Sequence, residues 1–201
     1  MLSGCSLSLF NNYKTIPVSA SSKPDSYSWF SGDTGRYLFQ SSIDIFRNNY
    51  SGLLFIKPLG NIHRIVFITE TGIKIFDFEL SENGDSKVYY CLEAMNRKSV
   101  INTLRKDLSL MLYSIPENSK VTVMQDKSTG KMIFRLRDNY GKRYCTINRK
   151  IQRVEELIST GAFTNKLNIK FFSTKISEPD SVILSHYNLK LKMHLINLNE
   201  N

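Results

Sequence analysis

The sequence predicts a mainly β (α+β) protein in which an antiparallel sheet is covered by a central amphipathic helix. Short apolar runs separated by turn signals fill both halves of the chain, and such runs are typical of β-strands joined by hairpins. Between the halves, one segment repeats its apolar residues with helical spacing. The last segment alternates between apolar and polar residues, as a half-buried strand does.

Length and composition allow a full hydrophobic core. The chain has 201 residues, of which 41% are hydrophobic, and this length favours one domain or one domain with a tail. Its apolar runs, such as 53–56 and 65–68, are far shorter than the roughly 20 residues that a membrane-spanning helix needs. Any membrane attachment is therefore expected to come from a lipid.

Four residues near the start, Leu2–Cys5, match the lipobox of bacterial lipoproteins. The motif is an aliphatic residue, two small residues and a cysteine, and here it is Leu-Ser-Gly-Cys. The small side chains admit a signal peptidase, and the thiol receives a diacylglycerol. We therefore expect lipidation at Cys5, with a buried or incidental cysteine as the alternative. A basic and apolar leader normally precedes such a site, so we expect either that translation starts upstream of Met1 or that the leader has been lost from this sequence.

The first 35 residues are expected to be the lipobox and a flexible tether, followed by a folded domain over 36–201. Serine and asparagine are frequent in 6–35, and Pro17 and Pro24 oppose a helix there. Trp29 and Phe30 are the exception, because large aromatic side chains are costly to leave in water. These two residues are expected to mark where folded structure begins.

A meander of five strands is predicted for the first half of the folded domain. The strands are expected at Tyr37–Phe46, Gly52–Lys57, Arg64–Thr69, Ile73–Leu80 and Val88–Leu92. Two of them contain continuous apolar runs, whereas a sheet with one wet face would alternate. Both faces of this part of the sheet are therefore expected to be covered.

One strong amphipathic helix is predicted over Arg97–Tyr113. Its apolar residues recur at helical spacing, and polar residues occupy the other side. Asn96 is a suitable N-cap and Pro116 a suitable stop signal. The apolar stripe is typical of core packing, and a helix placed over an apolar sheet can also act as a lid.

The second half returns to strands. They are expected at Val121–Gln125, Met132–Arg137, Arg143–Asn148, Leu167–Phe172, Val182–Leu184 and Leu189–Leu198. The segment Ile151–Ile158 is expected to be a short helix.

The formal net charge of +9 raises the question of an anionic partner. Basic residues are dense over Lys131–Arg153, but alternation such as that in Phe134–Arg137 is typical of a half-buried strand with a solvated face. The other interpretations are a surface for anionic lipid headgroups or for nucleic acid. Because no nucleic-acid-binding motif accompanies the charges, we expect no nucleic-acid partner.

The sequence gives little support for catalysis, and we expect a protein that is not an enzyme. It contains no nucleophile elbow, zinc-protease motif, P-loop or dinucleotide fingerprint. His63, His186 and His194 are expected to be solvated, as are Asp77 and Glu79 at a strand edge. No catalytic residue, metal site or cofactor is predicted.

The two cysteines after Cys5 do not have metal-ligand spacing. Cys91 and Cys145 could form a disulfide in an oxidising periplasm. Both lie in strand-like apolar patterns, which favours two buried thiols instead.

The order of elements resembles the LolA/LolB-like lipoprotein-localisation superfamily of half-open barrels. A lipobox and tether are followed by antiparallel strands, a central helix and further strands, and Arg64–Phe78 is similar to a strand-turn-strand of lipoprotein members. The resemblance implies a half-barrel around an apolar cavity that holds acyl chains. The hairpin Glu70–Gly72 departs from the family, since it is too short for a protruding cargo-delivery loop. The candidate cavity residues are Leu54, Ile56, Val66, Ile68, Ile73, Ile75, Leu104, Leu108 and Met111.

The leading functional hypothesis is a lipid-anchored envelope protein that binds or transfers lipid acyl chains or lipoproteins. Its expected location is the bacterial outer membrane, facing the periplasm, since Ser6 after the cysteine is compatible with outer-membrane sorting. The alternative is a structural or interaction lipoprotein without a ligand cavity, which docks envelope proteins. A third hypothesis is a hydrolase whose site residues meet only in three dimensions.

Overall fold

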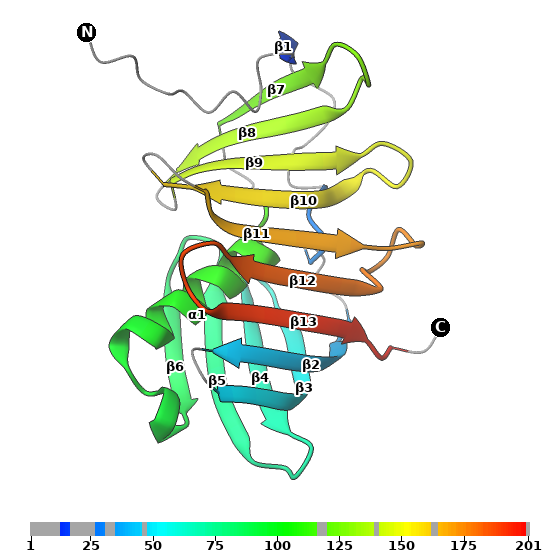
Figure 1. Cartoon of the computed structure of the whole chain (residues 1–201). Coiled ribbons are helices and arrows are strands. Elements are labelled where there is room, and N and C mark those ends of the chain that lie inside the picture. The colour runs from blue at the N-terminus through cyan, green and yellow to red at the C-terminus, as the bar shows by residue number, and fades with distance from the viewer. Residues whose placement is uncertain are drawn as a thin grey trace, which may run out of the picture.

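The computed structural model describes residues 13–16, 27–30, 35–45, 48–115, 120–138, 141–161 and 165–199. The lipobox Leu2–Cys5, with the predicted lipidation site Cys5, lies outside the described residues. Those that are described form one antiparallel sheet of 13 strands and one α-helix, α1 (Lys98–Leu112). The sheet is curved, with α1 on its inner side (Figure 1). The predicted fold class, a mainly β half-barrel with one amphipathic helix, is confirmed.

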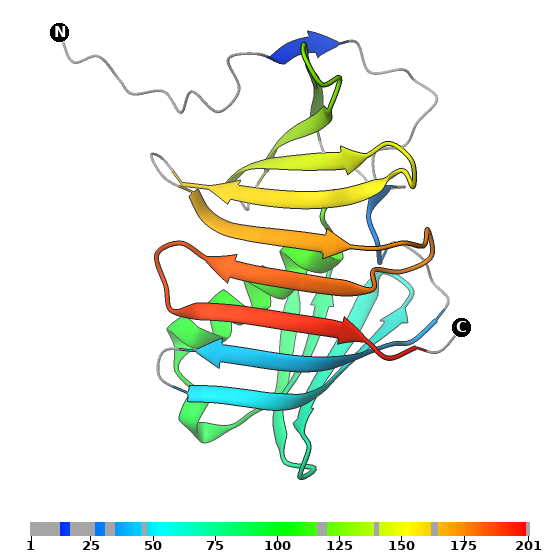
Figure 2. The same cartoon turned by 45° about the vertical axis from the view of Figure 1, so that its right-hand side comes forward.

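The sheet consists of two meanders that meet side by side. Its spatial order is β1-β7-β8-β9-β10-β11-β12-β13-β2-β3-β4-β5-β6. The strands are β1 (Tyr13–Ile16), β2 (Tyr37–Ile45), β3 (Asn48–Leu59), β4 (Ile62–Thr69), β5 (Lys74–Ser81), β6 (Ser86–Cys91), β7 (Val121–Asp126), β8 (Met132–Asp138), β9 (Gly141–Asn148), β10 (Arg153–Thr160), β11 (Asn165–Phe172), β12 (Ser181–His186) and β13 (Leu191–Asn197). A 3₁₀ turn, η3 (Glu93–Met95), follows β6. The last strand, β13, pairs with β2, so the second meander joins the first where their last and first strands lie side by side (Figure 2).

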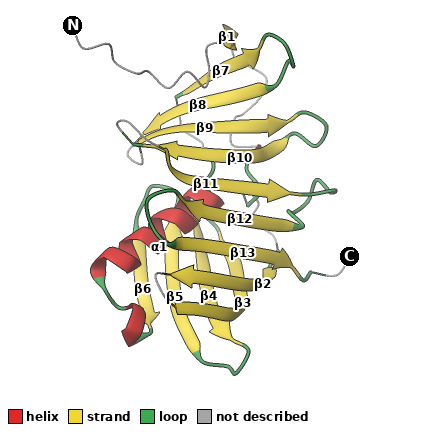
Figure 3. Ribbon diagram, viewed as in Figure 1, coloured by secondary structure: helices red, strands yellow, loops and turns green. Residues whose placement is uncertain are grey.

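Alternation along the strands divides the sheet into an inner and an outer face. In β2, Phe39 and Ile43 are fully buried, while the residue that follows each of them, Gln40 and Asp44, is exposed. The inner residues of nearly all strands join α1 in one hydrophobic core. Figure 3 shows α1 in red crossing the inside of the curve between the two meanders. The helix therefore supplies the inner cover that the apolar strands require.

The predicted short helix over Ile151–Ile158 is wrong, because residues 153–160 form strand β10. Its register against β9 shifts between Val154 and Glu156, which marks a β-bulge. The bulge places both Val154 and Leu157 in the core, although they are three residues apart. A spacing of three is normally helical, which explains the incorrect prediction.

Two parts of the predicted tether over 1–35 belong to the fold. Strand β1 pairs with β7, with Thr15 opposite Met124. Trp29 and Phe30 are buried in the core, as predicted from their size. The indole Nε1 of Trp29 donates a hydrogen bond to the Val154 carbonyl at 2.7 Å. Folded structure therefore begins before residue 36.

The basic segment forms strands with a solvated face, as predicted. Arg135 and Arg137 are exposed on β8, whereas Phe134 and Leu136 between them are buried. Arg143 on β9 is the exception, since its side chain is fully buried. Because arginine is charged, the alternation of apolar and polar residues did not predict that this side chain would lie on the inner face of the sheet.

Both Cys91 and Cys145 are thiols. Cys145 is buried and its sulfur donates to the Ser114 carbonyl, while Cys91 is half-buried on the edge strand β6. Within the described ranges, no helix is long and apolar enough to cross a membrane.

Gly52 lies where the backbone of β4 comes very close to β3. A Cβ atom added there would lie 2.0 Å from the Ile68 carbonyl oxygen and 2.7 Å from the Thr69 Cα. We expect Gly52→Ala to lower the free energy of unfolding by at least about 2 kcal/mol, because backbone atoms cannot move aside as a flexible side chain can. Urea denaturation measures this, with Ser51→Ala on the exposed side of the same strand as the control. Equal stability of the two variants would contradict the close approach.

Asp77 was predicted to be solvated, but it is buried on β5. Arg64 Nε lies 2.5 Å from its Oδ1, and Lys74 Nζ lies 3.0 Å from its Oδ2. Burial raises the pKa of Asp77, but the hydrogen bonds from Arg64 and Lys74 outweigh this and hold the pKa below its usual range. Glu79, two residues on, accepts a hydrogen bond from Tyr89.

The lowered pKa of Asp77 predicts a pH-dependent effect of Asp77→Asn. The ionised carboxylate stabilises the fold above the unfolded-chain pKa of about 4, and this stabilisation is lost as pH falls through the lower folded-state pKa. We expect the variant to be less stable than wild type by about 1–3 kcal/mol at neutral pH. The difference should shrink in acid. Urea titrations across pH measure it, and Glu70→Gln at the exposed hairpin tip should show no such trend.

Candidate ligand-binding site

The nine candidate cavity residues divide between the two faces of the sheet. Six of them are almost fully buried in the core between the sheet and α1: Leu54, Ile56, Ile75, Leu104, Leu108 and Met111. Val66 and Ile68 point to the outer face, because the inward residues of β4 are Ile65 and Phe67. Ile73 precedes β5 and is 55% exposed. A continuous apolar run conceals which residues point inward, so the sequence did not separate these groups.

The inner core is rich in aromatic contacts. Phe76 stacks on Phe78 with ring centroids 4.7 Å apart, and Phe67 lies 5.5 Å from Phe76. Phe30, from the N-terminal segment, meets the edge of Tyr37 at 4.9 Å. These residues help to fill the interior between the sheet and α1.

Helix α1 is tied to strand β12 by a buried hydrogen bond between a carboxyl group and an imidazole. Asp107 Oδ2 on the helix lies 2.7 Å from His186 Nε2. Burial raises the pKa of Asp107, and the hydrogen bond with His186 acts in the opposite direction. The prediction that His186 is solvated is therefore wrong. It contacts a carboxylate from a residue 79 positions earlier, which no local sequence pattern reveals.

A second polar cluster fixes the C-terminal end of α1. The Arg143 guanidinium donates to the carbonyls of Tyr113 at 3.5 Å and Ser114 at 3.4 Å. A cation is favourable there because the last carbonyls of a helix carry partial negative charge. Ser28 Oγ accepts a hydrogen bond from the Ile115 backbone N–H at 3.1 Å. This end of the helix is therefore held by both meanders and the N-terminal segment.

His63 belongs to this cluster and is also buried, contrary to the prediction. Its Nε2 donates to the Phe30 carbonyl at 3.1 Å, and its Nδ1 lies 2.8 Å from the Tyr113 hydroxyl. The Tyr113 hydroxyl donates its one hydrogen to the Leu80 carbonyl at 3.0 Å. His63 is thus a structural link between β4 and α1. His194 is exposed on β13, as predicted.

A pocket of about 380 Å³ opens beside α1 and leads toward the core. We call it the mouth pocket. Its lining comes from the helix, from β10 to β12 and from the turn after β12: Asn102, Thr103, Lys106, Asp107, Leu110, Ser159, Lys166, Leu167, His186, Asn188 and Leu189. Leu110 and Leu167 are only 1% exposed, so they form its deep end. Lys106 and Lys166 are exposed at its rim.

The mouth pocket contains a serine, a histidine and an aspartate, which bears on the hydrolase hypothesis. Ser159 is buried, and the hydrogen bond of the His186 ring in this pocket goes to Asp107. Nucleophilic catalysis requires the base to lie within hydrogen-bond reach of the nucleophile. Among the described residues, no hydrogen bond joins Ser159 to His186, and no three metal-ligating side chains gather.

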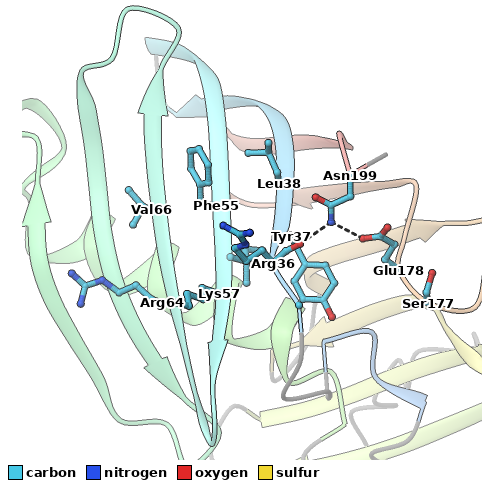
Figure 4. Close-up of a pocket in the computed structure, with 12 residues that line it drawn as sticks. Arg36, Tyr37, Leu38, Phe55, Lys57, Arg64, Val66, Ser177, Glu178 and Asn199 are labelled. Atoms are coloured by element: carbon cyan, nitrogen blue, oxygen red, sulfur yellow. Dashed lines mark hydrogen bonds between the residues drawn. The ribbon is translucent and has the colours of Figure 1, made fainter. Parts of the chain in front are cut away.

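A larger groove of about 840 Å³ lies on the opposite, outer face. Figure 4 shows Leu38, Phe55 and Val66 beside one another on adjacent strands, with the cationic side chains of Arg36, Lys57 and Arg64 next to them. We call this the outer groove. Val66 and Ile56, two of the predicted cavity residues, contribute to its lining. Polar groups from the β11–β12 loop and the C-terminal end complete it: Ser177, Glu178 and Asn199.

Comparisons with known proteins show similarity in structure only. No protein-family model matches the chain, and no curated protein matches it. The fold is similar to a LolA superfamily protein from Nitrosomonas europaea, with a TM-score of 0.59 and 10% sequence identity over 91% of this chain and 93% of that one. It is also similar to a domain from Vibrio parahaemolyticus assigned to outer membrane lipoprotein sorting, with a TM-score of 0.55 and 9% identity over 82% and 84% of the two chains. The chain therefore has a LolA-like fold, as the sequence predicted.

Proposed function

We propose that this protein binds an acyl chain of a lipid or lipoprotein between α1 and the inner face of the sheet, as a carrier or acceptor in the bacterial envelope. The mouth pocket is the main support, because it joins solvent to Leu110 and Leu167 in the apolar interior. Its volume of about 380 Å³ lies within the range of small-molecule pockets, about 300–1,000 Å³. Each methylene buried there contributes about 0.8 kcal/mol.

Binding requires α1 to move, since the core beneath it is filled. Leu104, Leu108 and Met111 face this core, and an entering acyl chain would take over their contacts with the sheet. The C-terminal end of α1 is fixed by Arg143 and Ser28. The side of α1 that borders the mouth pocket is therefore the side that opens, with the Asp107–His186 pair as the contact that must yield.

The rim of the pocket suits a ligand with an anionic group. Lys106 and Lys166 are exposed on either side of the opening, and ammonium groups attract phosphate and carboxylate. An acyl chain in the interior would leave its headgroup between them. A phospholipid or an acylated peptide would satisfy both parts of the site.

The names of the structural neighbours agree with this function, since one is assigned to outer membrane lipoprotein sorting. The Leu2–Cys5 pattern supports lipidation of Cys5 and a place at the outer membrane, facing the periplasm. We further propose that the protein acts by binding and not by catalysis. The alternative hypothesis, an interaction lipoprotein without a ligand, differs by predicting that the interior stays closed.

Mass spectrometry of the full chain tests ligand binding and anchoring together. The chain is produced in bacteria behind a lipoprotein leader, and a second form carries Cys5→Ser and is purified without detergent. We expect the Cys5→Ser form to show phospholipid or acylated peptide at nearly one per chain under native conditions, with organic extraction identifying it. We expect the form with Cys5 to carry a covalent diacylglycerol mass. A clean apo mass after incubation with lipid would overturn acyl binding and favour the interaction lipoprotein.

His186→Ala tests whether α1 opens at the mouth pocket. The variant removes the partner of buried Asp107, so we expect a stability loss of about 1–3 kcal/mol. We also expect severalfold faster uptake of a fluorescent fatty acid, measured by stopped flow, because α1 separates from β12 more easily. Gly52→Ala is the matched control, since the contact that it disturbs is between β3 and β4 and does not involve the Asp107–His186 pair. Equal acceleration in both variants would mean that general loosening, and not the Asp107–His186 contact, controls entry.

A further inference from the structure

The outer face of the sheet carries an apolar patch that no described residue covers. Leu38, Phe55 and Val66 are directly opposite one another on β2, β3 and β4, and Leu53 and Ile68 form the next row. We call these five residues the outer patch. Phe55 is 40% exposed and the other four are half-buried. A contiguous apolar area on the wet face of an antiparallel sheet usually marks an interaction site.

Cations border this patch along one side. Lys57 on β3 is directly opposite Arg64 on β4, and like charges opposite one another across two strands are unfavourable without an anion. Arg64 has its anion in Asp77 at 2.5 Å, and its guanidinium lies over the Tyr89 ring at 3.4 Å. Within the described part of the chain, no ion pair involves Lys57 or the Arg36 side chain. These two cations are available to an external anion.

The carboxylate of the outer groove does not neutralise them. Glu178 Oε2 accepts a hydrogen bond from Asn199 Nδ2 at 2.9 Å, and the same amide donates to the Arg36 carbonyl at 2.8 Å (Figure 4). Asn199 thus lies between Glu178 and the backbone of Arg36. The groove keeps an excess of positive charge beside its apolar floor.

Exposed tyrosines extend the same surface toward the sheet edge. Tyr89 and Tyr90 on β6 are 44% and 41% exposed. Lys74, beside Ile68 in the register, points its ammonium toward the Tyr90 ring at 6.0 Å. Tyrosine is enriched where proteins meet the headgroup layer of membranes, because its ring is apolar and its hydroxyl is polar.

We propose that the outer patch, with Arg36 and Lys57, docks the protein on the surface of an anionic lipid bilayer. Phe55 and its neighbours enter the boundary between headgroups and acyl chains, and the two cations bind lipid phosphates. Charge complementarity favours a bilayer, since the chain has a net charge of +9 and the cations border an apolar and aromatic surface. This contact is on the opposite face from the mouth pocket, so it does not depend on acyl binding in the interior.

Vesicle flotation tests the proposal on the full chain carrying Cys5→Ser, which removes the predicted anchor. Vesicles contain either phosphatidylcholine alone or phosphatidylcholine mixed with phosphatidylglycerol. We expect the protein to float with the anionic vesicles, to remain free from the neutral ones, and to dissociate as salt is raised. Acyl binding alone would leave the protein in the soluble fraction with lipid bound, so the two proposals fail separately.

Charge-reversal variants locate the contact. Arg36→Glu combined with Lys57→Glu should weaken binding to anionic vesicles about tenfold or more, and Phe55→Ser should weaken it with the charge unchanged. The matched controls are Lys150→Glu combined with Lys192→Glu, and Tyr187→Ser, all at exposed positions away from the patch. Absence of binding to anionic vesicles would overturn the proposal. So would equal loss in the control pair, which would indicate attraction by net charge alone.

Discussion

The structure depends on one helix filling the inside of a curved sheet. An open sheet of this curvature exposes an apolar inner face, and α1 covers it with residues such as Val100, Leu104 and Leu108. Apolar contact alone does not fix a helix at one position along a smooth apolar surface. Directional polar contacts do so, and they are expensive to leave unmade once they are buried. The buried polar groups around α1 therefore specify where the cover lies.

These polar contacts are distributed unevenly along α1. The C-terminal end is held by Arg143 from β9 and by Ser28 from the N-terminal segment. The hydroxyl of Tyr113 at this end donates to the backbone of β5. The middle has the Asp107–His186 pair and the bond from Arg105 to the Ser86 carbonyl at 3.3 Å. A helix held in this way pivots most easily about its C-terminal end. The mouth pocket is on the side that would open, which links the packing of the fold to the proposed function.

Much of the fold was predictable because each of its signals is local. Turn residues and apolar runs located eleven of the strands, and helical spacing located α1. The exceptions have physical causes. Strand β10 was missed because its bulge allows Val154 and Leu157, three positions apart as in a helix, to share the core. Strand β1 was missed because it is a short edge strand within a serine- and asparagine-rich segment.

The candidate site was less predictable, because its polar contacts join distant residues. His186 meets Asp107 and His63 meets Tyr113 only after the sheet has curved around α1. The buried position of Arg143 depends on the carbonyls at the end of α1, and its sequence context resembles a solvated strand. Element order therefore indicated the fold, while the residues of the mouth pocket come together only in three dimensions.

The apolar character of β3 and β4 on both faces connects the two proposed binding surfaces. Leu54 and Ile65 point inward to the core, whereas Phe55 and Val66 point outward. The inner side has its cover in α1, and no described element covers the outer side. An exposed apolar face without a partner promotes aggregation. Large apolar side chains are therefore not expected there unless the face binds something. Its flanking cations make the surface suitable for an anionic bilayer, and docking there would leave the mouth pocket, on the opposite face, open to incoming ligand.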